Sequence, residues 1–115
     1  MGPVDGSEGA PVDVEEVSTF FKSVAAVSRA EEILVAQHKE AVQADELLLA
    51  QEKVMLDDLN EADGCSVDEY AAALEKVLAA KLRICSELHH RLDALKDVMA
   101  KEEALSARVK RVPLY

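Results

Sequence analysis

The stretch DGCSVDE at residues 63–69 decides the fold, because a signal that ends one helix is followed at once by a signal that starts another. Gly64 is predicted to take the left-handed conformation that follows many helix C-termini. Ser66 is a good N-cap residue, and Glu69 stands three residues later, so the pair has the form of a capping box. The stretch therefore predicts a turn at residues 62–66 between two helices.

Upstream of this turn, residues 14–61 have the composition of one long helix. They contain no Gly or Pro and are rich in Ala, Leu, Glu, Gln and Lys, which are good helix formers. A second start signal at Ser28 leaves a restart open, but a nearly continuous helix, at most kinked there, is favoured because no Gly or Pro intervenes. Apolar residues recur every seven positions, with Gln37 and Gln51 at intermediate positions, so the segment predicts an imperfect coiled-coil seam. The seam residues are Leu34, Ala41, Leu48 and Met55.

Downstream of the turn, residues 67–110 carry an apolar band that is wider than a two-residue seam. Its predicted centre is a stripe of Leu74, Leu78, Leu88, Leu92, Leu95 and Met99, in which Cys85 is a small core residue. Four further residues widen the stripe: Val77, Ile84, Val98 and Leu105. One partner helix cannot cover such a band. We therefore expect a homodimer that buries the stripe, or else cover from residues 14–27 of the same chain.

These elements predict an all-α protein folded as a long antiparallel helical hairpin, coiled-coil-like, whose bundle is completed by dimerisation. A single helical domain is expected at residues 13–112. Residues 1–12 hold most of the Gly and Pro and are interpreted as a flexible lead, and residues 113–115 as a tail.

The charge balance disfavours several partners. The chain has 13 basic and 23 acidic residues, a net charge of −10, so nucleic acid and anionic membranes are not expected to bind it. No apolar run is long enough to span a bilayer. The cysteines, Cys65 and Cys85, have no metal-ligand spacing, which favours reduced thiols in the cytoplasm.

Motifs for chemistry are missing as well. After Gly9 the only glycine is Gly64, so there is no phosphate-binding loop. His89 and His90 are adjacent and would point about 100° apart on a helix, which does not suit one shared ion. The sequence thus predicts a protein that is not an enzyme, with no catalytic, cofactor-binding or metal residues.

Two charged groups are candidate docking surfaces for a protein partner. The first is an acidic outer face on the first helix, including Glu40, Asp45 and Glu46. The second is the basic end of the last helix, formed by Arg108, Lys110 and Arg111. An acidic face would steer a basic partner towards it. A purely solubilising role for that face stays open.

Five stretches resemble the segment that follows the motor in the microtubule-depolymerising kinesin-13 family. They are EEILVAQHK at residues 31–39, QEKVML at 51–56, the turn and restart DG…VDEY…L at 63–74, the run at 81–95 and EEALS at 102–106. The resemblance covers about residues 29–109. Because the motor is absent, it carries over no catalytic or nucleotide-binding residue.

The resemblance implies a regulatory, dimerising and partner-binding domain at the C-terminus of a microtubule-associated motor. It implies contact with a second copy, with the motor or neck of the same kinesin, or with a basic adaptor. Because tubulin is itself acidic, weak or no direct microtubule binding is expected from the domain alone. The alternative is a free-standing helical adaptor or scaffold unrelated to kinesins.

Overall fold

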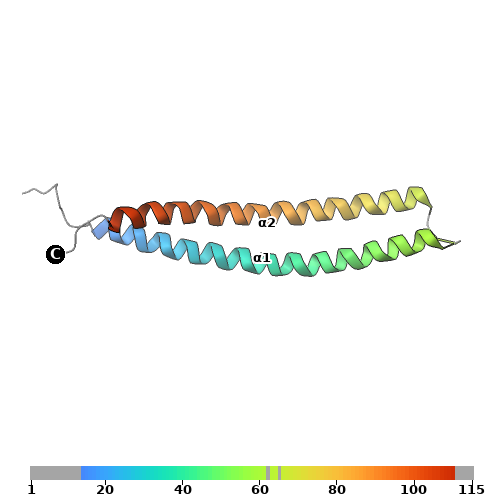
Figure 1. Cartoon of the computed structure of the whole chain (residues 1–115), viewed down its shortest axis with the longest axis horizontal. Helices are drawn as coiled ribbons and strands as arrows, with labels where there is room; N and C mark the ends of the chain where they lie inside the picture. The colour runs from blue at the N-terminus through green and yellow to red at the C-terminus, as the bar shows by residue number, and fades with distance from the viewer. Residues whose placement is uncertain (1–13, 62, 65, 111–115) are drawn as a thin grey trace, which may run out of the picture. The chain divides into compact units, whose positions relative to one another are not determined.

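The computed structural model describes residues 14–61, 63–64 and 66–110, and within them the chain is an all-α helical hairpin, as predicted (Figure 1). Helix α1 spans Val14–Asn60 and helix α2 spans Val67–Lys110. The first helix ends one residue before its predicted end. The predicted lead and tail lie outside the described residues.

The connection between the helices is a tight turn. The Glu61 amide donates to the Asp58 carbonyl at 3.3 Å, and the Gly64 amide donates to the Glu61 carbonyl at 3.1 Å. Gly64 is not left-handed, so that expectation is wrong. The position needs glycine for a different reason, since a Cβ atom there would lie 1.5 Å from the Asp58 carbonyl oxygen.

The predicted capping box is confirmed at the start of α2. The Ser66 amide donates to Glu69 Oε1 at 3.1 Å, and the Glu69 amide donates to Ser66 Oγ at 3.2 Å. Hydrogen bonding of the Glu69 carboxylate by the Ser66 backbone amide, and after it by the Ser66 side chain, lowers the pKa of the Glu69 carboxyl below its usual value. Two amides at the start of α2 are thereby satisfied by side chains.

Helix α1 is continuous through Ser28, so the helix does not restart there. The Thr19 hydroxyl donates to the Glu15 carbonyl one turn earlier at 2.8 Å, which satisfies that polar side chain within the helix. Residues 14–27 therefore extend α1 and do not form a separate third helix. Residues 14–27, the second of the two expected sources of cover, are grouped with residues 93–110 of α2 and not with residues 67–92.

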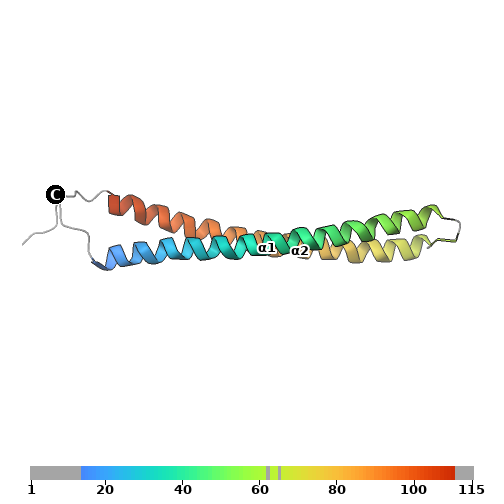
Figure 2. The ribbon, with the colours of Figure 1, turned by 90° about the horizontal axis from the view of Figure 1, so that it is seen from below.

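The described residues form two compact units. Unit 2 comprises residues 34–92 and contains the turn, with the second half of α1 and the first half of α2 side by side (Figures 1 and 2). The α1 side of its seam is formed by the predicted seam residues. The α2 side is formed by two neighbouring rows, one containing Val77 and Ile84 and the other Leu74 and Leu88. Ala41, Leu48 and Val77 are buried, and Leu34, Met55, Leu74, Ile84 and Leu88 are half-buried.

Two polar pairs link the helices of unit 2 along the edge of the seam. Arg91 Nε donates to Gln37 Oε1 at 3.0 Å, and Lys81 Nζ lies 2.8 Å from Glu52 Oε1. Paired polar groups inside a coiled-coil seam favour one register over its neighbours, at some cost in stability. The hydrogen bond from Arg91 accounts for the polar residue Gln37 on the α1 side of the seam.

Unit 1 combines residues 14–33 of α1 with residues 93–110 of α2. Arg108 forms an ion pair with Glu16 across it. Phe20 is half-buried, whereas its neighbour Phe21, with the ring centroids 5.6 Å apart, is exposed. The α2 side is supplied by half-buried Leu95, Val98 and Leu105.

Candidate functional site

The predicted dimer stripe on α2 is divided by the structure into two rows. Leu74, Leu88 and Leu95 are half-buried, while Leu78, Leu92 and Met99 are exposed. Cys85 is also exposed and is not the small core residue that was predicted. The physical reason is a shift of one position, because Val77, Ile84, Val98 and Leu105, predicted only to widen the stripe, face α1 instead.

The exposed row of α2 in unit 2 lies over two hollows. One is a shallow, open surface on α2 alone, with Leu74, Leu78 and Leu82 in its lining. The other, of about 300 Å³, lies between the helices and is lined by Leu34, His38, Cys85, Leu88, His89 and Leu92. Together they give α2 an apolar surface that α1 does not cover.

Helix α1 carries a matching row that sequence reasoning missed. Val35, Val42, Leu49 and Leu56 are seven residues apart, and all four are exposed. The seven-residue spacing of this row can be read from the sequence. Each of its residues, however, directly follows a residue of the predicted seam, so the row was not recognised as a second apolar row. We call this row, together with Leu78, Leu82, Cys85 and Leu92 of α2, the lateral face.

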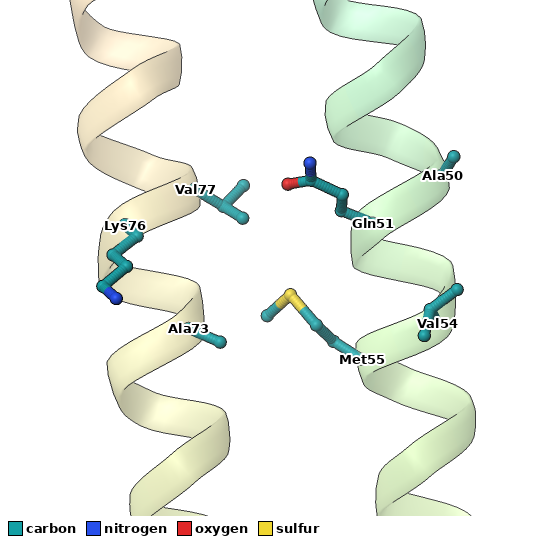
Figure 3. Close-up of a pocket in the computed structure, with 7 residues that line it drawn as sticks. All are labelled: Ala50, Gln51, Val54, Met55, Ala73, Lys76 and Val77. Carbon is teal, nitrogen blue, oxygen red and sulfur yellow. The ribbon is translucent and has the colours of Figure 1, made fainter.

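The opposite side of unit 2 has a looser seam near the turn. Gln51 and Met55 of α1 point towards Ala73 and Val77 of α2, around a hollow of about 500 Å³ (Figure 3). An amide at Gln51 and a methyl group at Ala73 leave this space poorly filled. The exposed apolar side chains of α1 on this side are Leu47 and Val54.

The predicted acidic docking residues are all exposed but do not form one surface. Glu40 lines a hollow of about 190 Å³ that Glu87 of α2 also lines. Asp45 follows five positions later, which turns its side chain about 140° around the helix axis from that of Glu40. Glu46 lies a further 100° or so around, so the three carboxylates point in three directions.

The predicted basic docking end is only partly described. Arg108 is engaged with Glu16 within unit 1, so a partner that uses Arg108 must compete with that ion pair. The side chain of Lys110 and all of Arg111 lie outside the described residues. An exposed ion pair of this kind contributes about 0.2–1 kcal/mol, which a partner can displace easily.

Within the described ranges, no group of three His, Cys, Asp or Glu side chains could hold a metal ion, although His38, Cys85 and His89 line one hollow. Neither described helix is apolar over a stretch long enough to cross a membrane. What the described surface offers is apolar rows and separate charges, which are the ingredients of protein–protein contact.

Comparison with known proteins finds a similarity to a kinesin. The chain is similar to Diatom spindle kinesin-1 of Cylindrotheca fusiformis, with 34% identity over 91 residues, which is 76% of this chain. The match spans only 14% of that kinesin. No family model matches the chain, and no solved structure matches it. The similarity is therefore to a short part of a kinesin.

Proposed function

We propose that this chain is a non-catalytic helical module of a kinesin-like protein, which self-associates and binds a protein partner. The observation that carries the proposal is the lateral face, an exposed apolar surface with seven-residue spacing on both helices of unit 2. Rows with this spacing suit packing against other helices. The similarity to a kinesin segment supports the kinesin-like part of the proposal.

The proposed place of this module is the C-terminal regulatory region of a microtubule-depolymerising kinesin of the kinesin-13 family. The order of five motifs over residues 29–109 supports this assignment. The proposed partner is the motor or neck of the same kinesin, or a basic adaptor, because the chain has a surplus of ten negative charges. The module would then act on the cytoskeleton.

The proposal is tested with the full-length polypeptide that carries this chain. We expect it to contain a kinesin motor, and we expect the isolated chain to bind that motor and change its microtubule-stimulated ATPase rate when added in trans. The chain alone should hydrolyse no ATP. A full-length polypeptide without a motor would favour a free-standing adaptor and overturn the proposal.

A microtubule co-pelleting assay tests whether the isolated module binds microtubules or leaves that contact to the motor. The net charge of −10 opposes the acidic tubulin surface, so the isolated chain should stay in the supernatant at physiological salt. The motor with its neck serves as the positive control. Strong co-pelleting of the isolated chain would mean that the module binds microtubules directly.

A further inference from the structure

We propose that two copies of this chain pack lateral face against lateral face, as a four-helix bundle in which α1 of each copy lies over α2 of the other. In this arrangement the two turns lie at the same end of the dimer. The inference deepens the self-association in the proposed function and rests on it. All residues of the lateral face belong to unit 2, so the proposal concerns that unit alone.

The spacing of the lateral face specifies helices as its occupant. On α2, Leu78, Leu82 and Cys85 follow one another at steps of four and three, and Leu92 continues the row seven residues later. This is the spacing of a coiled-coil seam, which fits between the side chains of another helix with the same period. Since α1 presents a second row of period seven, the face matches a surface made of two helices. The hairpin itself is such a surface.

The chain cannot cover this face with the part that the structure describes. Helix α1 is continuous from Val14 to Asn60, so residues 14–27 do not fold back as a third helix. Both helices of unit 2 already use their seam rows against each other. The cover must therefore come from outside the described residues, and a second copy presents the same two rows.

The size of the face suits a stable dimer. From Val35 to Leu56 the α1 row is about 32 Å long at 1.5 Å per residue, and two helices side by side are about 20 Å wide. The footprint is thus roughly 600 Å² per copy, or roughly 1,200 Å² in total, which is the lower limit of the standard interface range.

Charge selects between the two ways in which a two-fold axis can pair the hairpins. Residues 34–60 carry six carboxylates and two lysines, whereas residues 67–92 carry four acidic and four basic residues. Stacking α1 on α1 would bring two acidic helices together, with Asp45, which lies near the middle of the α1 row, close to Asp45 of the other copy. Stacking α1 on α2 places the acidic helix opposite a helix whose four acidic and four basic residues balance, so like charges stay apart.

The interface is tested by sedimentation velocity on matched variants. Leu82 on the lateral face is 72% exposed and Leu47 on the opposite side is 68% exposed, so neither Leu→Gln change should unfold the hairpin. We expect the wild type to dimerise and Leu82→Gln to raise the dissociation constant by roughly tenfold or more, since each substitution acts twice in a symmetric dimer. Leu49→Gln should have the same effect, and Leu47→Gln should have none.

A wild-type chain that stays monomeric up to about 1 mM overturns this inference together with the self-association. A dimer that is weakened by Leu47→Gln but not by Leu82→Gln or Leu49→Gln overturns the lateral face alone. Binding to the motor, measured with the Leu82→Gln variant, tests the remainder of the proposed function separately.

The arrangement is tested by a distance between spin labels. A label is placed on Asp63→Cys, in a chain whose Cys65 and Cys85 are replaced by Ser, and the label-to-label distance is measured across the dimer. With the turns at the same end the distance should be below about 25 Å, whereas turns at opposite ends of unit 2 would place the labels about 40 Å apart or more. The longer distance would overturn the proposed arrangement.

Discussion

Position 64 requires glycine because two backbone segments of the turn approach each other closely there. A Cβ atom there would stand 1.5 Å from the Asp58 carbonyl oxygen, so a side chain at this position forces the backbone to shift. We expect Gly64→Ala to destabilise the fold by about 1–3 kcal/mol, measured by urea unfolding. Asp63→Ala, an exposed neighbour in the same turn, is the control and should be nearly neutral. Equal stability of both variants would show that the turn relaxes freely.

The Glu69 carboxylate makes the capping box sensitive to acid. Its pKa is lowered in the folded chain by hydrogen bonds from Ser66, so it stabilises the fold at neutral pH. This contribution is complete above the ordinary pKa of 4.5 and is lost as the pH falls through the lower folded value. Glu69→Gln keeps an acceptor for the Ser66 amide but cannot titrate. Its melting temperature should therefore fall less than that of the wild type between pH 7 and pH 3.

At the residue scale, the sequence allowed the cap to be predicted but not the reason for the glycine. A capping box needs two residue types three positions apart, and both can be read from the chain. The close approach at Gly64 depends on where the Asp58 carbonyl lies in three dimensions. No local sequence pattern encodes where the Asp58 carbonyl lies. The sequence therefore predicts the more common left-handed conformation for Gly64.

At the scale of the helices, the seam near the turn can be improved by one substitution. Gln51 points into the hollow that Met55, Ala73 and Val77 share (Figure 3). Gln51→Leu should fill part of this space with apolar atoms and stabilise the hairpin by about 1 kcal/mol, measured by thermal unfolding. Gln43→Leu introduces the same change at an exposed α1 position outside the hollow and should add little. A lower melting temperature for Gln51→Leu would mean that the hollow cannot accept the branched side chain.

The position of the α2 seam could not be predicted because two neighbouring rows of α2 are both apolar. The true seam is bordered by half-buried Lys81 and exposed Arg91, which look like surface charges in a linear sequence. Their partners are Glu52 and Gln37 on α1, 29 and 54 residues away. If these pairs are not known, the row of Leu78, Leu92 and Met99 is the more apolar of the two and is therefore predicted to face α1. The wide band was recognised, but periodicity alone does not say which part of it faces α1.

For the chain as a whole, the all-α hairpin could be predicted because all the local signals agree on it. The helix-stop and helix-start signals, the absence of Gly and Pro in both helices and the seven-residue repeat give the same answer. The interaction surface was harder to predict. It depends on which rows remain exposed after the helices pair, and that is settled only by the pairing itself.

The acidic residues give the last prediction, which concerns how a basic partner docks. Because Glu40 and Asp45 lie about 140° apart around α1, a partner that binds one side of the hairpin can contact only one of them closely. Charge reversal should therefore be split into two variants, Glu40→Lys and Asp45→Lys with Glu46→Lys. We expect only one of them to weaken binding of the motor–neck segment, measured by calorimetry.

The affinity of the affected variant for the motor–neck segment should also depend less on salt between about 0.05 and 0.3 M NaCl. The lost attractive contact is the part of the binding free energy that salt screens. If the Asp45 and Glu46 variant is the affected one, the basic partner and the second copy compete for the lateral side, and binding should fall as the chain dimerises. If Glu40→Lys is affected, the two events are independent. Equal weakening by both variants would show that only the overall negative charge attracts the partner, and a docking site on α1 would be ruled out.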